Sequence, residues 1–157
     1  MLLNDEIFMT VIKSTPLVSI DLLITNELGN VLLGERLNQP AKKNWFVPGG
    51  RIRKNEHLDE AFERLMTEEL GYACSRAHSR FLGVFEHFYQ DSMFSDKQDG
   101  ISTHYVVLAY TVPWNSPEKD HEWPLIQHAR LRWWNIQDAM ASDAVHSYSK
   151  AYFSYLK

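Results

Sequence analysis

The sequence predicts an α/β or α+β fold in which helices pack on a mixed sheet. Two observations lead to this prediction: several short runs are rich in β-branched and aromatic residues, and two longer segments repeat apolar residues at helical spacing. The chain has 157 residues, of which 45% are hydrophobic, and this is enough to bury a core without a partner. Because no repeat, low-complexity tract or long linker divides the chain, we expect a single domain over residues 1–157.

The predicted elements follow one another along the chain. Strands are expected at residues 18–25, 31–35, 80–90, 103–112 and 130–135. Gly29 and Asn30 suit the turn between the first two strands, because both residues accept left-handed backbone conformations. Helices are expected at residues 56–70 and 145–156. In the second helix the apolar repeat is made by Val145, Tyr148, Tyr152 and Tyr155.

The composition argues against some classes of protein. A formal net charge of -4 is opposite to the basic excess of a general nucleic-acid binder. The only cysteine, Cys74, cannot form an intramolecular disulfide, so we expect a reducing, cytoplasmic location. The segment MLLNDEIFMTVIK has acidic residues where a signal peptide is positive, and no apolar run approaches the roughly 20 residues that cross a bilayer. We therefore expect a soluble protein that binds neither nucleic acid nor membrane.

A basic segment precedes the first predicted helix. Between residues 35 and 54 the cationic residues are Arg36, Lys42, Lys43, Arg51, Arg53 and Lys54, and the only acid is Glu35. A solvated basic loop is one interpretation. The segment also contains Pro48-Gly49-Gly50, and glycines allow the backbone to approach a ligand closely. Cations beside an open backbone favour the other interpretation, a site for an anionic ligand.

The predicted helix at residues 56–70 carries carboxylates close to its apolar face. At about 100° per residue, Glu69 falls inside the apolar arc beside Leu65, and Glu68 falls at its edge. A buried carboxylate requires a partner, because an isolated buried charge is strongly unfavourable. From spacing alone, an arginine or lysine ion pair and a metal ion are equally good partners. Glu56, at the start of the helix, suits the positive end of the helix dipole.

Residues 50–72 resemble the Nudix box, Gx5Ex7REUxEExGU, in which U is a bulky apolar residue. The matching residues are Gly50, Glu56, Arg64, Met66, Glu68, Glu69, Gly71 and Tyr72. The segment WFVPGG, which leads into the box, is also typical of the family. The resemblance implies the Nudix α/β/α sandwich with a mixed central sheet. It also implies Mg²⁺-assisted attack of water on a nucleoside diphosphate that is joined to another group.

Leu65 departs from the box, which has a glutamate at this position. Position 65 lies three residues before Glu68 and four before Glu69, and both spacings place helical side chains on one face. A glutamate here would join the metal cluster and a leucine cannot, so the departure favours a single bound metal ion. The alternative is that Leu65 only extends the apolar face of an ordinary or impaired family member.

Over nearly the whole chain the sequence is similar to the GDP-mannose mannosyl hydrolase branch of the Nudix family, which also has a leucine at this position of the box. The similar segments are STPLVSID (14–21), WFVPGGR (45–51), AFERL (61–65), EHFY (86–89), THYVVL (103–108), QH (127–128) and SKAYF (149–153). The resemblance implies hydrolysis of GDP-mannose, or of GDP-glucose, at the anomeric carbon of the sugar. It also implies a homodimer.

The same resemblance implies how the metal ion and the attacking water are held. One Mg²⁺ per active site, replaceable by Mn²⁺, is bound by the carbonyl of Gly49, the carboxylate of Glu69 and the amide of Gln127. Oxygen ligands of this kind suit Mg²⁺. His128 is the general base that takes a proton from water, and attack on the face opposite GDP inverts the configuration of the sugar. The role of Glu68 stays open.

Further residues are implied to contact the substrate. The residues implied at the departing diphosphate and the metal site are Arg36, Arg51, Tyr105 and Arg64. The residues implied at the sugar are Asp21 and His87. GDP is a weakly basic leaving group, so a base alone is sufficient, whereas usual glycosidases must also protonate a sugar hydroxyl. Independently of the resemblance, Asp21 interrupts an apolar strand and must face a polar site, solvent or a partner such as Arg36.

Structural roles are the alternative for several of these side chains. His87 and Tyr105 lie in aromatic strands, where packing in the sheet is the default. Trp133 and Trp134 either stack on the guanine or pack beneath the sheet.

His128 also has a plain alternative. It follows Gln127 in the non-periodic segment 113–129, a position that suits an active-site loop, but a histidine in a loop is usually a solvated residue.

Two other functions also stay open. A conventional Nudix pyrophosphohydrolase would yield a nucleoside monophosphate and a sugar phosphate. A noncatalytic nucleotide-binding module would show no turnover.

Overall fold

The computed structural model describes residues 2–115, 121–124 and 128–156, and at residues 128 and 129 it describes the backbone alone. Within these residues seven strands form one sheet. The strands are β1 (Leu17–Thr25), β2 (Val31–Arg36), β3 (Trp45–Phe46), β4 (Gly49–Arg51), β5 (Arg80–Tyr89), β6 (Thr103–Pro113) and β7 (His128–Trp134). The helices are α1 (Asp5–Ser14), α2 (Leu58–Leu70), the 3-10 turn η1 (Arg76–His78), α3 (Ile136–Ala141) and α4 (Ser147–Phe153).

β1 lies in the middle of a mixed sheet whose main strand order is β3-β2-β1-β6-β5. It pairs with β6 in parallel, from Leu17 opposite Tyr105 to Thr25 opposite Pro113. The pairings of β1 with β2 and β4, of β2 with β3 and β7, and of β5 with β6 are antiparallel. A central strand that is covered on both faces needs apolar residues at consecutive positions, and β1 has them in LVSIDLLIT.

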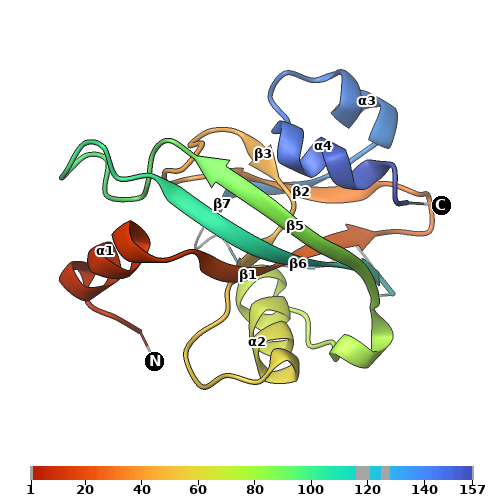
Figure 1. Cartoon of the computed structure of the whole chain (residues 1–157). Helices are drawn as coiled ribbons and strands as arrows, with labels where there is room; N and C mark the ends of the chain where they lie inside the picture. The colour runs from red at the N-terminus through yellow and green to blue at the C-terminus, as the bar shows by residue number, and fades with distance from the viewer. Residues whose placement is uncertain (1, 116–120, 125–127, 157) are drawn as a thin grey trace.

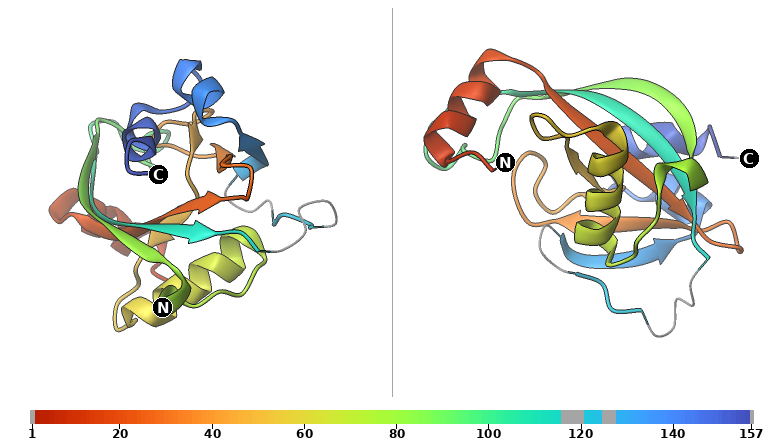
Figure 2. Two further views of the ribbon diagram at one scale, coloured as in Figure 1. Left: turned by 90° about the vertical axis from the view of Figure 1, so that its right-hand side faces the viewer. Right: turned by 90° about the horizontal axis from the view of Figure 1, so that it is seen from below.

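Helices cover both faces of the sheet, which gives the α/β/α sandwich that the sequence predicts (Figure 1; Figure 2). Successive side chains of a strand point to opposite faces. Leu22 of β1 therefore packs with Phe62 of α2 in one core cluster. Its neighbour Leu23 packs with Tyr152 of α4 in the other. The mixed sheet flanked by helices is confirmed.

The ends of α2 follow from local hydrogen bonds. The helix begins at Leu58, two residues after Glu56, which therefore lies before the helix and not in its first turn. The backbone N–H of His57 donates to the Glu60 carboxylate at 2.8 Å, which satisfies a group at the helix start. Gly71 ends the helix with a φ of 64°, a left-handed conformation that glycine adopts without strain.

The N-terminal helix α1 has no counterpart among the predicted helices. The Asn4 side chain caps it by accepting from the N–H of Ile7 at 2.9 Å. Its buried residue Ile12 joins a small third cluster with Phe94 and Ile101, between β5 and β6 in sequence. α1 therefore packs at the end of the sheet and away from the two main cores (Figure 1).

No helix in the described part of the chain has the length and apolar character needed to cross a membrane. Cys74 is present as a free thiol.

Candidate active site

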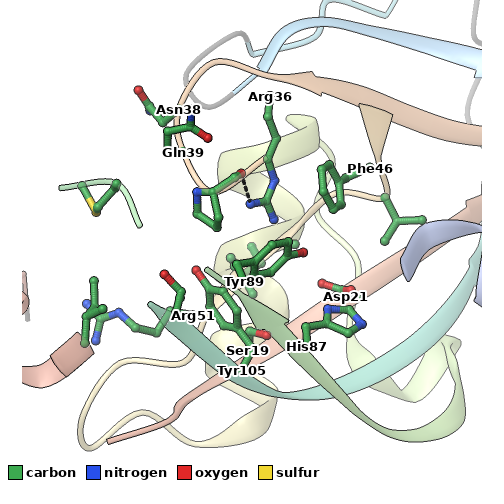
Figure 3. Close-up of a pocket in the computed structure, with 18 of the residues that line it drawn as sticks. Ser19, Asp21, Arg36, Asn38, Gln39, Phe46, Arg51, His87, Tyr89 and Tyr105 are labelled. Atoms are coloured by element: carbon green, nitrogen blue, oxygen red, sulfur yellow. Dashed lines mark hydrogen bonds between the residues drawn. The ribbon is translucent and has the colours of Figure 1, made fainter. Parts of the chain in front are cut away.

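A pocket of about 320 Å³ opens at one end of the sheet, and its walls come from α1, α2, the strands β1 to β6 and the connections between them. Figure 3 shows Asp21 and His87 at one side of this pocket and Arg51 at the other, with Tyr89 and Tyr105 between them. The residues of the predicted site that line it are Asp21, Arg36, Gly49, Arg51, Arg64, His87 and Tyr105. The fold therefore brings together residues that are far apart in the sequence.

Strand register explains this assembly. Asp21 of β1 stands opposite Gly49 of β4, and His87 of β5 stands opposite Tyr105 of β6. Because side chains alternate along a strand, residues two apart share a face. Tyr89 is thereby brought to the same side of β5 as His87, and both line the pocket.

Asp21 has a carboxyl group that titrates close to neutral pH. Burial raises its pKa to about 6, although a hydrogen bond from Tyr152 and the charge of Arg36 both oppose the shift. The Tyr152 hydroxyl donates to Asp21 Oδ2 at 2.6 Å. Of the surroundings expected for this acid, Asp21 has a polar pocket and feels the charge of Arg36, but its hydrogen-bond partner is Tyr152, which was not predicted.

His87 is a neutral imidazole at neutral pH. The side chain is 5% exposed, and burial, with the charges of Arg36 and His146, lowers its pKa to about 4. Its ring stacks on Tyr148 with centres 4.1 Å apart and an angle of 9° between the planes. His87 Nε2 lies 3.3 Å from the Tyr152 hydroxyl. His87 therefore both packs against its neighbours and lines the pocket.

Arg36 and Arg51 bring positive charge to the pocket. The guanidinium carbon of Arg36 lies 4.1 Å from the centre of the Phe46 ring, and that of Arg51 lies 4.6 Å from the centre of the Phe8 ring. Burial, followed by repulsion from Arg53 and then Arg64, lowers the pKa of Arg51. An anion placed here would relieve that repulsion. The anionic-ligand interpretation of the basic segment fits this arrangement.

Arg64 joins α2 to the segment that precedes it. Its Nε and Nη2 donate to the two carboxylate oxygens of Glu56 at 2.5 and 2.9 Å. Its Nη1 donates to Glu68 at 3.1 Å, and Nη2 also donates to the carbonyl of Arg51 at 3.0 Å. Arg53 is a second cation beside Glu68, at 3.7 Å. The hydrogen bond with Arg64 lowers the pKa of Glu56 to about 2. Glu56 is thus an arginine partner outside the helix, and the helix dipole does not explain it.

Leu65 and Glu69 lie on the buried side of α2. They are 1% and 4% exposed, respectively. A Cβ atom added to Gly50 would lie 2.6 Å from Leu65 Cδ2, so the leucine packs directly on the glycine that begins the box. Leu65 both joins the core cluster under the sheet and lines the pocket.

Oxygen donors suited to a hard divalent cation occur at this part of the pocket. Gly49 and Glu68 line it, whereas Glu69, the carboxylate that the resemblance implies as a ligand, is buried in α2 and does not line it. Among the described residues, no group of three or more His, Cys, Asp and Glu side chains could hold a metal ion. A small set made of a carboxylate and a backbone carbonyl still fits Mg²⁺, which keeps several ligands from water or substrate. A Cβ at Gly49 would collide with Asp21 and with the carbonyl of Ile20, so this close backbone requires glycine.

Gln127 lies outside the described residues, and only the backbone of His128 lies within them. β7 begins at His128, which stands opposite Arg36 of β2, where the pairing register shifts. The chain therefore passes a wall of the pocket as it leaves the segment 113–129.

Several side chains contribute to the site without having been predicted, and three of them matter most for its chemistry. Tyr89 lines the pocket, Phe8 lines it from α1, and Tyr152 reaches Asp21 from α4. Tyr152 lies at a helical repeat position, a signal that indicates burial and not a polar contact. Phe8 lies in a segment for which the sequence analysis predicts no helix.

The two tryptophans of β7 pack on opposite faces of the sheet. Trp134 belongs to the cluster under α4, with its ring 5.4 Å from that of Trp45. Trp133 packs against the cluster under α2. Neither residue lines the pocket, and their places in the two clusters fit the packing interpretation.

Comparisons with known proteins agree with this fold. The family model described as NUDIX domain matches residues 15–155. The chain is 41% identical over 128 residues to the low-salt glycan biosynthesis protein Agl8 of Haloferax volcanii, over 82% of this chain and 76% of that protein. The MutT NUDIX hydrolase of Burkholderia pseudomallei matches with a TM-score of 0.70 and 23% identity, over 92% of this chain and 100% of that one. The NUDIX domain of Shewanella oneidensis NrtR, complexed with ADP ribose, matches with a TM-score of 0.68 and 16% identity, over 98% and 96%. The chain therefore belongs to the Nudix family, whose hydrolases act on nucleotide derivatives and generally use divalent metal ions such as Mg²⁺.

Proposed function

We propose that the protein hydrolyses GDP-mannose, or GDP-glucose, to GDP and the free sugar, with water attacking the anomeric carbon. The observation that carries the proposal is the contact between Leu65 and Gly50. Leu65 places an apolar side chain at the position of the box from which a third carboxylate would reach the metal. Attack at phosphorus commonly relies on several metal ions held by several carboxylates. Attack at carbon requires chiefly a well-stabilised leaving group.

Cations of the pocket are proposed to stabilise the departing GDP. Arg36, Arg51 and Arg53 line the pocket, and Tyr105 adds a hydroxyl whose pKa is raised by burial, so that it stays a donor. Donors that are already in place where negative charge develops are effective catalysts. With this support GDP departs without protonation, and the site needs no strong general acid.

One metal ion is proposed per active site. The Gly49 carbonyl, the Glu69 carboxylate and the Gln127 amide would hold Mg²⁺, or Mn²⁺ in its place. When bound, the ion neutralises charge on the diphosphate. Arg64 is proposed to assist from beside the metal, because it hydrogen-bonds the carbonyl of Arg51 and so fixes the strand that carries this cation.

Asp21 and His87 are proposed to bind the sugar, and His128 to act as the general base. The backbone of His128 stands opposite Arg36, which supports a place for it near the leaving group. A histidine of unperturbed pKa near 6.5 can accept a proton from water at neutral pH. Attack opposite GDP would give the β-sugar from an α-linked substrate.

The comparison with Agl8 supports a substrate that contains a sugar, since the name of that relative refers to glycan biosynthesis.

We further propose that the chain forms one domain over residues 1–157 and a homodimer. Light scattering of the purified protein would measure the mass; a monomer at micromolar concentration contradicts the dimer.

A conventional pyrophosphohydrolase is the second candidate. Glu68 favours it, because the second carboxylate of the box is retained at the pocket and held by Arg64 and Arg53.

Hydrolysis of GDP-mannose in oxygen-18 water with Mg²⁺ separates these functions. The proposal predicts the label in free mannose and none in GDP. Label in GMP or mannose phosphate would establish cleavage at phosphorus. Absence of turnover with GDP-mannose and GDP-glucose, while GDP still binds, would support a noncatalytic nucleotide-binding module.

A further inference from the structure

Tyr152 places a phenol hydroxyl between Asp21 and His87, the two residues proposed to bind the sugar. The side chain is fully buried in the cluster under α4, where its ring packs edge-on against Phe85 at 4.8 Å. The hydroxyl lies 2.6 Å from Asp21 Oδ2 and 3.3 Å from His87 Nε2. Tyr152 does not line the pocket, so it touches the ligand only through these two residues.

The hydroxyl has one proton to share between these partners. An ionised carboxylate accepts and cannot donate, and a separation of 2.6 Å is that of a charge-assisted O–H to carboxylate bond. The proton therefore points to Asp21. Tyr152 keeps this proton, because burial and then the charge of Asp21 raise its pKa far above the usual range.

Only one direction of donation is then possible between Tyr152 and His87. The phenol oxygen has a free lone pair but no second proton, so His87 Nε2 must carry a hydrogen and donate it. Because burial keeps the imidazole neutral, Nδ1 carries the lone pair. Other titratable or charged groups facing Asp21 and His87 are Arg36, Tyr89, Tyr105, His146 and Tyr148.

We infer that Tyr152 is a positioning residue, which from the C-terminal helix orients the carboxylate of Asp21 and holds His87 in its Nε2–H tautomer. The Asp21 carboxylate and His87 Nδ1 are then hydrogen-bond acceptors, on two residues that both line the pocket. Two neighbouring acceptors suit a ligand that presents adjacent hydroxyl groups, as a sugar does. The catalytic consequence rests on the proposed function, whereas the tautomer does not.

The tautomer is measured by NMR of protein labelled with nitrogen-15 histidine, at pH 8, well above the usual range of carboxyl pKa values. The His87 signals are identified by their absence in His87→Gln. We expect a pyrrole-type Nε2 and a pyridine-type Nδ1 in the native protein and in Tyr155→Phe. Tyr155 is a matched control, because its ring also packs on Phe85, at 5.5 Å, but it is 44% exposed. Tyr152→Phe should show a mixture of tautomers. A native Nδ1–H tautomer, or an unchanged spectrum in Tyr152→Phe, would overturn the inference.

Kinetics then separate positioning from folding. Loss of a hydrogen bond to a charged group predicts a decrease of about tenfold to hundredfold in kcat/KM for GDP-mannose in Tyr152→Phe. The Kd for GDP, which lacks the sugar, should stay within about twofold of the native value. Equal losses in GDP affinity and turnover would indicate a structural role and contradict the assignment. If the native protein hydrolyses no GDP-sugar, the proposed function fails, and the NMR result still decides the tautomer.

Discussion

Leu65 affects both the packing of α2 and the proposed chemistry. It is almost fully buried against Gly50, within the cluster that includes Phe62 and Ile20. A carboxylate in this position would lose its hydration, and only a metal ion or an arginine could compensate for that loss. Arg64, the adjacent cation, is already bound to Glu56 and Glu68. The leucine is therefore consistent with its surroundings as well as with the proposed chemistry.

The two glycines that face this part of the pocket should respond differently to an added methyl group. In Gly49→Ala the new Cβ would meet the backbone of Ile20 and Asp21, which cannot move without disturbing β1. In Gly50→Ala it would meet a terminal methyl of Leu65, which can shift. We expect Gly50→Ala to lower the unfolding free energy by about 1–3 kcal/mol, and Gly49→Ala to lower it more.

Urea unfolding measures both changes. The double mutant Gly50→Ala, Leu65→Ala tests the cause, because removing the leucine removes the collision. Its loss of stability should be smaller than the sum of the two single losses. Strict additivity would show that Leu65 is not what the new methyl group meets.

The Glu56–Arg64 pair predicts a dependence of stability on pH. The pKa of Glu56 is lowered from 4.5 to about 2 in the folded protein, first by the hydrogen bond with Arg64. The ionised pair therefore stabilises the fold above pH 4.5, and this contribution is lost as pH falls toward 2. Glu56→Gln should lower the unfolding free energy by roughly 2 kcal/mol at pH 7 and by less below pH 4. Glu63→Gln, at an exposed position of the same helix, is the control. A Glu56→Gln effect of the same size at pH 3 and pH 7 would contradict the ion pair.

At the scale of elements, the site depends on which strands are neighbours. The parallel pairing of β1 with β6 and the antiparallel pairing of β5 with β6 place β5 two strands from β1. Asp21 and His87 can then share the hydroxyl of Tyr152, which α4 brings over that face of the sheet. β7 pairs with the other side of β2, so that the backbone of His128 reaches Arg36. Each of these elements carries a different part of the proposed reaction.

The place of His128 at the start of β7 leads to a test of the general base. His128→Gln should lower kcat for GDP-mannose by about 100-fold to 10,000-fold, because water then loses its proton acceptor. The affinity for Mg²⁺ should stay the same, since the proposed ligands are other residues. His78→Gln is the control, as this exposed ring hydrogen-bonds Ser75 at 2.9 Å and does not line the pocket. Steady-state kinetics and Mn²⁺ titration measure the two properties; full activity of His128→Gln would exclude this role.

For the whole molecule, elements with a strong residue pattern were predictable. Very short strands, and contacts between residues far apart in the sequence, were not. The long strands and α2 have apolar repeats, and the box residues have fixed spacing. β3 and β4 have two and three residues, too few for any periodic signal. α1 was missed for another reason: its segment was weighed only as a signal peptide, although Ile7, Phe8, Val11 and Ile12 recur at helical spacing. The link between Tyr152 and Asp21 joins residues 131 positions apart and depends on the completed fold. The side chains of Gln127 and His128 lie outside what the structure describes, and their roles stay predictions.

The helix α1, which was not predicted, has a consequence for ligand binding that can be measured. Phe8 lines the pocket, its ring lies 4.6 Å from the Arg51 guanidinium, and Phe94 packs edge-on against it at 6.0 Å. The ring therefore holds Arg51 in place at the pocket, where it would meet the diphosphate of the proposed substrate. Removing a cation–π contact of about 0.5–1 kcal/mol should raise the Kd for GDP about twofold to fivefold in Phe8→Ala. Ile7→Ala, the adjacent position, is the control, because Ile7 is 50% exposed and does not line the pocket. Calorimetric titration with GDP and Mg²⁺ compares the two. Equal affinities would mean that α1 only covers the end of the sheet, whereas a loss confined to Phe8→Ala would make this terminal helix a part of the binding site.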